Sequence, residues 1–148
     1  MSPIRILIAD DYQPFRQSVR RVCELEAEFE VIGEAKNGHE AVELAHRLQP
    51  DVILMDIEMP IMNGIEATRL IVAQNPETRV IALTATGQDG GAINMLKAGA
   101  YGYMIKRTRD SNLVQVIRAV HRGEAMIDSH VTAQMLDELR RISKQKVI

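Results

Sequence analysis

DVILMDIEMPIMNG, residues 51–64, is the segment around which the rest of this chain is arranged. The apolar run at 52–55 is typical of a strand buried on both faces of a parallel sheet. Asp56 follows at once, and Pro60 then prevents the strand from continuing. A carboxylate at the end of a buried strand costs free energy unless a neighbouring group uses its charge. Because open α/β sheets bind ligands at the carboxyl ends of their strands, Asp56 is the leading candidate for a functional residue.

Strand-like and helix-like segments alternate along the chain. Further strands are predicted at 4–9, 29–35, 79–83 and 102–105. Polar residues interrupt the second of these, which indicates a strand near an edge of the sheet. Helices are predicted to begin near Gln13, Asn37 and Gly64, to cover 92–98 and 110–122, and to begin again near Ser129. Five successive β-α units predict an α/β fold, a doubly wound parallel sheet with helices on both faces.

The composition limits the kind of protein this can be. At 148 residues, with 46% hydrophobic and 26% charged residues, the chain is predicted to form one globular domain with a short appendage. A formal net charge of -2 argues against a strong nucleic-acid-binding surface. No apolar run approaches the roughly 20 residues that span a bilayer, and no signal peptide opens the sequence, so a cytoplasmic protein without membrane contact is expected. Cys23, the single cysteine, is predicted to be a buried apolar residue and not a nucleophile.

Polar residues follow four of the five predicted strands. They are Asp10 and Asp11, Asp56, Thr84 and Lys106. Each has an ordinary structural explanation when taken alone: an Asp pair often caps a helix, a Thr often lies in a turn, and a Lys is usually a surface charge. The ends of parallel strands meet at one edge of a sheet, however, so these residues are predicted to converge. Their joint occurrence favours a functional site.

The residue types at this edge suit phosphoryl chemistry. Three carboxylates in one pocket repel one another, and a hard divalent cation resolves the repulsion. Mg²⁺ prefers carboxylate and carbonyl oxygens and often shares a phosphate with the protein. Lys106 adds a positive charge for a phosphoryl oxygen, and Thr84 adds a hydroxyl donor. The sequence therefore predicts a magnesium site at which a phosphoryl group is bound.

Four motifs together resemble the receiver domain of bacterial response regulators, over about residues 4–122. They are ADD at 9–11, LMDIEMPIMNG at 54–64, TA at 84–85 and KAGAYGYMIK at 97–106. The last of these, with GEAMIDSHVTAQML at 123–136, is similar to the NarL/FixJ-type branch, whose members usually carry a LuxR-like helix-turn-helix domain after a linker. The resemblance implies a flavodoxin-like fold with strand order 2-1-3-4-5.

The resemblance also implies roles for individual residues. Asp56 would be the phosphoacceptor, and Tyr103 the aromatic switch residue that swings inward on activation. The groups implied to bind Mg²⁺ are Asp11, Asp56 and the backbone carbonyl of Glu58, with Asp10 acting through a water. The groups implied to hold the phosphoryl oxygens are Thr84, the backbone N–H of Ala85 and Lys106.

Partners and a domain division follow from the same resemblance. A sensor histidine kinase is the implied phosphodonor, and the surface of residues 92–103 is a candidate homodimer interface. Residues 1–124 are predicted to form the receiver domain, and residues 125–148 a linker with an additional helix. DNA binding is expected only through an output domain missing from this chain. An excised receiver is favoured over a stand-alone regulator, because the final helix has no other evident role.

Two other functions are compatible with the same residues. A Mg²⁺-dependent phosphatase with an aspartyl-phosphate intermediate also needs a strand-end Asp, a hydroxyl and a Lys. Such enzymes usually have a general-acid Asp two residues after the nucleophile, where this chain has Glu58, and a cap for which 148 residues leave little room. A degenerate receiver that acts only as a binding module is the other alternative. The complete set of three Asp residues, Thr84 and Lys106 argues against it.

Overall fold

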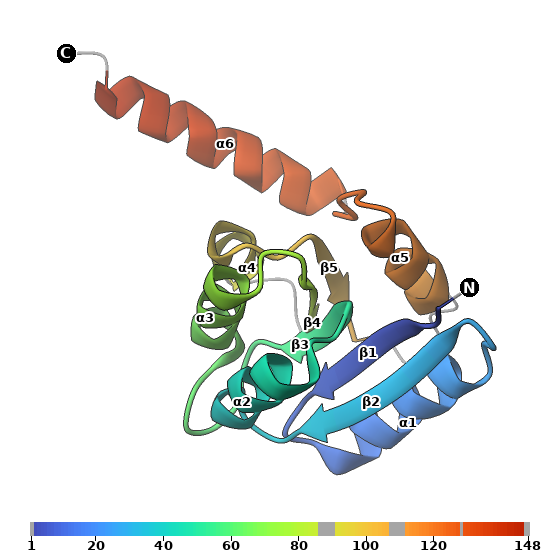
Figure 1. Cartoon of the computed structure of the whole chain (residues 1–148). Helices are drawn as coiled ribbons and strands as arrows, with labels where there is room; N and C mark the ends of the chain where they lie inside the picture. The colour runs from blue at the N-terminus through green and yellow to red at the C-terminus, as the bar shows by residue number, and fades with distance from the viewer. Residues whose placement is uncertain (1, 86–90, 107–111, 128, 147–148) are drawn as a thin grey trace.

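The computed structural model describes residues 2–85, 91–106, 112–127 and 129–146, and its strands form a five-stranded parallel sheet (Figure 1). The strand order is β2-β1-β3-β4-β5, which confirms the predicted fold class and topology. The strands are β1 (Ile4–Ala9), β2 (Phe29–Ala35), β3 (Val52–Asp56), β4 (Arg79–Thr84) and β5 (Gly102–Ile105). The helices are α1 (Gln13–Glu24), α2 (Gly38–Leu48), α3 (Gly64–Gln74), α4 (Gly91–Ala98), α5 (Asn112–His121) and α6 (Ser129–Lys146).

The predicted elements differ from the observed ones only at their ends. β3 and β4 each include one further residue, Asp56 and Thr84, because both residues pair with the neighbouring strand. α4 begins at Gly91, one residue earlier than predicted. The predicted start of the fifth helix at 110 lies outside the described residues. β2 lies at an edge of the sheet, as its interrupting polar residues predict.

Helices cover both faces of the sheet and enclose two hydrophobic cores. α1 and α5 lie on one face, where Val19 and Cys23 of α1 belong to the same core as Ile117 of α5. α2, α3 and α4 lie on the other face, with Ala41 of α2 and Ile71 of α3 in the second core. β1, β3 and β4 contribute residues to both cores, because successive side chains of a strand point to opposite faces. This position explains why all five residues of β3 are buried.

Side-chain caps fix the points at which α2 and α3 begin. Asn37 Oδ1 accepts a hydrogen bond from the backbone N–H of Glu40 at 2.8 Å. Asn63 Oδ1 likewise accepts from the backbone N–H of Glu66 at 2.9 Å. Each bond satisfies an N–H group that has no partner within its helix. The caps therefore set where the chain turns back from the carboxyl edge of the sheet, the edge that carries the candidate site.

α6 runs across α4 and extends beyond it, away from the sheet (Figure 1). Val131, near the start of α6, is 1% exposed and belongs to the core on the α4 side of the sheet. Lys97 Nζ of α4 lies 2.8 Å from Glu138 Oε1 of α6. Just before α6, the backbone of Met126 pairs with that of Gly102 at the open edge of β5. The segment predicted as a linker is thus packed against the α/β domain, and its linking role stays a prediction.

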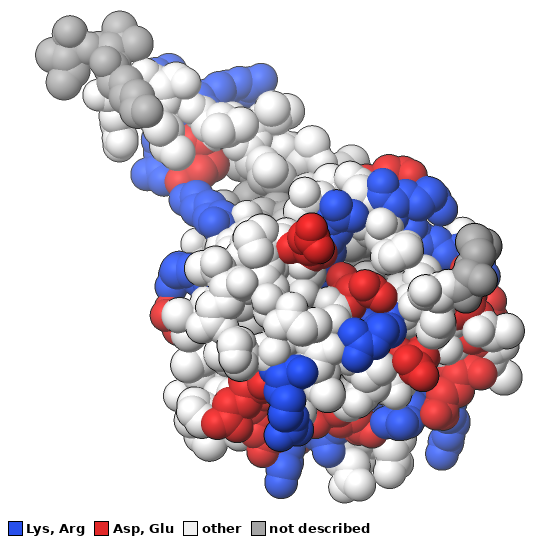
Figure 2. Space-filling view, viewed as in Figure 1, with Lys and Arg blue, Asp and Glu red and all other residues white. Residues whose placement is uncertain are grey.

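Charge is unevenly distributed between α6 and the rest of the molecule. Figure 2 shows acidic and basic side chains interspersed over the body, whereas Lys and Arg predominate on the projecting α6. The charged residues of α6 that follow Glu138 are all basic: Arg140, Arg141, Lys144 and Lys146. None of the helices in the described part of the chain is long and apolar enough to cross a membrane.

Candidate functional site

The carboxyl ends of β1, β3, β4 and β5 meet at one edge of the sheet. β1 and β3 are in register where they end, which brings Asp10 beside Asp56. β4 and β5 stay paired as far as the site, where the backbone N–H of Lys106 donates to the carbonyl oxygen of Thr84 at 2.7 Å. The parallel register thus brings together polar residues from four strands, as the sequence predicts.

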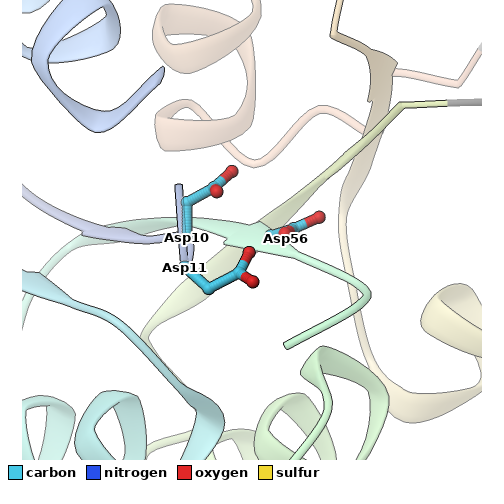
Figure 3. A group of neighbouring side chains, drawn as sticks. All are labelled: Asp10, Asp11 and Asp56. Atoms are coloured by element: carbon cyan, nitrogen blue, oxygen red, sulfur yellow. The ribbon is translucent and has the colours of Figure 1, made fainter. Parts of the chain in front are cut away.

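Three carboxylates gather at this edge (Figure 3). Asp10 and Asp11 come from the end of β1 and Asp56 from the end of β3, and one oxygen of each lies within 4.8 Å of the others. Asp10 and Asp56 are buried, with 1% and 6% of their surface exposed, whereas Asp11 is exposed. Like charges at this separation repel strongly in a partly desolvated site. The cluster therefore needs a cation.

Lys106 supplies positive charge from the end of β5. Its Nζ lies 3.3 Å from Asp56 Oδ1 and makes a shorter ion pair with Asp10 Oδ2. One ammonium group cannot compensate three carboxylates. Beyond this ion pair with Lys106, no hydrogen bond to the buried Oδ2 of Asp10 is found among the described residues.

The residues present therefore suit Mg²⁺. They offer hard carboxylate oxygens from Asp10, Asp11 and Asp56, and backbone carbonyls follow in the loop after β3. The three carboxylates outnumber the single ammonium of Lys106, and a divalent cation would offset the negative charge that this ammonium leaves uncompensated.

Burial raises the pKa of Asp56 to about 6. The negative charge of Asp10 contributes to this rise, while the ammonium of Lys106 opposes it. Asp56 is thus still largely ionised at neutral pH, and its charged form is held at a cost in folding free energy. A group of this kind at a strand end favours a site that binds cations or reacts.

The loop between β3 and α3 is held by its main chain at both ends. Gly64 N–H donates to the carbonyl of Ile57 at 2.7 Å, and Gly38 N–H of α2 donates to the carbonyl of Met62 at 2.9 Å. Between these anchors Ile61 has a φ of 72° and a side chain that is 83% exposed. A positive φ is rare for a β-branched residue, so the anchors impose the shape of this loop against the local preference of the chain.

The other predicted site residues occupy different environments. Thr84 is buried at the end of β4, and Ala85, directly after it, is exposed. The side chain of Glu58 is exposed in the loop after β3. Tyr103 of β5 is 4% exposed and belongs to the core on the α4 side. The roles of these residues toward a metal or a phosphoryl group, and the movement of Tyr103, stay predictions.

Two residues of α1 reach the site although the sequence did not identify them as functional. The ring of Phe15 has its centroid 4.5 Å from Lys106 Nζ. Arg16 Nη1 donates to the backbone carbonyl of Asp10 at 2.6 Å, and Arg16 Nε is paired with Glu34 of β2 at 3.0 Å. The available signal was proximity: the first turn of a helix that begins directly after a strand necessarily lies near the end of that strand.

Known proteins resemble this chain in sequence and structure. A family model described as the response regulator receiver domain matches residues 6–118. The chain is 40% identical over 139 residues to "Transcriptional regulatory protein DegU" of Brevibacillus brevis, an alignment that spans 94% of this chain and 59% of that protein. A solved structure of a LuxR-family two-component response regulator from Aurantimonas superposes with a TM-score of 0.82 at 34% identity, covering 94% of this chain and 99% of that one. A second, from the CheX-CheY-BeF3-Mg+2 complex of Borrelia burgdorferi, gives a TM-score of 0.74 at 28% identity and covers 80% and 90%.

Proposed function

Because this chain belongs to the response regulator receiver domain family, in its NarL/LuxR branch, we propose that Asp56 accepts a phosphoryl group from a sensor histidine kinase in the presence of Mg²⁺. The observation that carries the proposal is the cluster of Asp10, Asp11 and Asp56, whose carboxylate oxygens lie within 4.8 Å of one another. Lys106 stands beside this cluster, 3.3 Å from Asp56 Oδ1, as a phosphoryl-binding cation requires.

The proposed transfer is a displacement at phosphorus. An oxygen of the Asp56 carboxylate bonds to phosphorus while the P–N bond to the phosphohistidine of the kinase breaks, and the bonding electron pair stays on the imidazole nitrogen. Asp11, Asp56 and the carbonyl of Glu58 would hold Mg²⁺ directly, and Asp10 would complete the acidic set. The bound ion supplies positive charge for the phosphoryl oxygens.

Three groups of the chain receive the phosphoryl oxygens. Lys106 provides its ammonium, which is already adjacent to Asp56. Thr84 provides its hydroxyl and Ala85 its backbone N–H, both at the end of β4. Positioning and electrostatic compensation carry most of the catalysis in such a site, so small phosphodonors are also expected to react. Later attack by water breaks the acyl phosphate, releases inorganic phosphate and restores the Asp56 carboxylate.

The signal is the charge added at Asp56, which shifts the populations of two arrangements of α4 and β5. Tyr103 is the proposed reporter within β5, and residues 92–103 form the proposed homodimer surface. α6 already packs on α4 through the Lys97–Glu138 pair, so α6 covers part of that surface. Dimerisation would therefore use the part that α6 leaves free, or require α6 to move.

Control of transcription is the proposed output. The relative DegU is named a transcriptional regulatory protein, and this chain spans 59% of the length of that relative. DNA binding is assigned to an output domain joined through residues 125–148. The net charge of -2 supports the view that this chain by itself binds DNA poorly.

The test is intact-protein mass spectrometry after incubation with Mg²⁺ and acetyl phosphate. A receiver gains the mass of one phosphoryl group, and Asp56→Asn gains none. Rapid turnover of phosphomonoesters by the wild type would instead indicate the phosphatase. A wild-type protein that gains no mass with acetyl phosphate, phosphoramidate or a phosphorylated kinase would contradict the proposal and indicate a degenerate binding module.

A further inference from the structure

A cation–π contact joins Lys106 to the first turn of α1. Lys106 Nζ lies 4.5 Å from the centroid of the Phe15 ring, inside the roughly 6 Å over which an ammonium group is attracted to an aromatic face. Only 14% of the Lys106 side chain is exposed, and Phe15 is half-buried against the core that α1 shares with α5. Cation–π attraction is strongest where water is excluded in this way.

The ring differs in kind from the other two groups that attract this ammonium. The carboxylates of Asp10 and Asp56 attract Lys106 Nζ through their negative charge. A cation or a phosphoryl group at the site changes the net charge around these carboxylates, and therefore the strength of their attraction for the ammonium. The Phe15 ring has no charge and does not titrate, so binding of a cation or protonation of a carboxylate does not remove its attraction for the ammonium.

The position of the ring is tied to that of Asp10. Tyr12 N–H donates to Asp10 Oδ1 at 2.9 Å, and Phe15 N–H donates to the carbonyl of Tyr12 at 3.1 Å. Arg16, the next residue, donates to the carbonyl of Asp10 at 2.6 Å. The acidic end of β1 and the first turn of α1 are therefore one connected unit that presents a carboxylate and an aromatic face to the same ammonium group.

We propose that Phe15 is a positioning residue for phosphoryl transfer, whose aromatic face keeps the Lys106 ammonium beside Asp10 and Asp56. The inference rests on the proposed phosphoacceptor role of Asp56. It accounts for an aromatic residue at a position where the packing of α1 alone requires only an apolar one. The contact that Phe15 makes at the site is with the Lys106 ammonium, so its effect runs through Lys106.

The decisive experiment weakens the aromatic face without changing its shape. Phe15 is replaced by a series of phenylalanine analogues whose rings carry an increasing number of fluorine atoms. For each variant the rate constant of phosphorylation by acetyl phosphate is measured at saturating Mg²⁺. The rate constant is expected to fall with each added fluorine, and Phe15→Leu to lower it roughly three- to tenfold. Phe15→Tyr keeps the aromatic face and should retain most of the rate. Equal rates throughout the fluorinated series would overturn the inference.

Phe29 offers a matched control within the same chain. Phe29 is the first residue of the edge strand β2, away from the carboxyl edge that carries Asp10, Asp11 and Asp56, and its ring centroid lies 6.0 Å from the guanidinium carbon of Arg118. The same fluorinated series at Phe29 is expected to leave the rate unchanged. A parallel loss of rate in both series would mean that fluorination acts through general packing, and this too would overturn the inference.

A second measurement tests the contact without any phosphorylation. The ring current of an aromatic side chain shifts nearby protons upfield, and the Lys106 ε-methylene group is bonded to the ammonium nitrogen that faces the Phe15 ring. The NMR resonance of the ε-methylene protons should therefore lie further upfield in the wild type than in Phe15→Leu. An unshifted wild-type resonance would overturn the inference and leave the phosphoacceptor role of Asp56 standing. A wild-type protein with the shift but with no phosphoryl adduct would overturn the proposed function, and with it the positioning role.

Discussion

Gly64 lies directly against the main chain of Asp56: a Cβ atom on Gly64 would come within 2.0 Å of the backbone oxygen of Asp56. The N–H of Gly64 donates to the carbonyl of Ile57 at 2.7 Å, so the end of β3 and the start of α3 touch through main chain alone. A backbone oxygen cannot move aside as the end of a flexible side chain can. Any side chain at position 64 must therefore displace the strand end that carries the candidate phosphoacceptor.

Gly64→Ala is expected to destabilise the protein and damage the site together. The overpacking should lower the free energy of unfolding by about 2–4 kcal/mol and weaken Mg²⁺ binding, because Asp56 shifts. Urea unfolding followed by circular dichroism and titration calorimetry with Mg²⁺ measure the two effects. Gln74→Ala, on the exposed end of α3, is the control and should change stability by less than about 0.5 kcal/mol. Wild-type behaviour of Gly64→Ala would show that the loop relaxes freely.

Asp56→Asn is expected to stabilise the metal-free protein near neutral pH. Burial raises the pKa of Asp56 from 3.8 to about 6, so within this window the folded chain holds a proton that the unfolded chain has released. Ionisation of Asp56 therefore lowers the free energy of unfolding as the pH rises from about 4 to above 6, by up to about 3 kcal/mol. The Asn variant does not lose this stability, so its free energy of unfolding should exceed that of the wild type at neutral pH, and the two values should converge near pH ~4.

Urea-unfolding curves of both proteins in the presence of a chelator, across this pH range, check the prediction. Added Mg²⁺ should narrow or reverse the difference in free energy of unfolding between the two proteins, because the ion binds the folded wild type more tightly than the folded variant. A difference in stability that does not depend on pH would mean that the carboxylate of Asp56 is not destabilised by its surroundings.

The edge of the sheet at which the site residues lie could be predicted from the sequence, because polar residues stand at the ends of apolar runs. Asp10, Asp56 and Thr84 each stand at the end of a β-branched or apolar segment, and parallel pairing forces such ends to one edge. The fold class rests on the same alternation. What the sequence leaves undetermined is how the side chains share partners at that edge, such as the bonding of Lys106 to Asp10 as well as Asp56.

The residues that each helix packs against were harder to predict than the strand order of the sheet. A helical period shows that Phe15 and Val131 lie on apolar faces, but the period does not name the neighbour that each face meets. Phe15 proves to contact Lys106, and Val131 belongs to the core that also contains Met95 of α4 and Tyr103 of β5. The positive φ of Ile61 left no signal either, because a β-branched residue is among the least expected at that conformation.

Val131→Ala is expected to destabilise the α/β domain although Val131 lies in the segment predicted as a linker. Val131 is 1% exposed within the core that contains Met95 and Tyr103, and removing two methyl groups there should cost about 1–2 kcal/mol. Leu136→Ala, at an exposed site in the same helix, is the matched control. The measured quantity is the free energy of unfolding. Equal values for Val131→Ala and wild type would mean that α6 detaches in solution.

Asp11→Asn separates the metal-binding role of the acidic cluster from its effect on folding. Asp11 is exposed, so the substitution should leave the fold intact while it removes one direct ligand and lowers Mg²⁺ affinity roughly tenfold or more. The metal-free variant should be slightly more stable than wild type, because one of three mutually repelling charges is gone. Asp137→Asn makes the same charge change on exposed α6 and should alter neither quantity. Unchanged Mg²⁺ affinity by calorimetry in Asp11→Asn would exclude this carboxylate from the metal site.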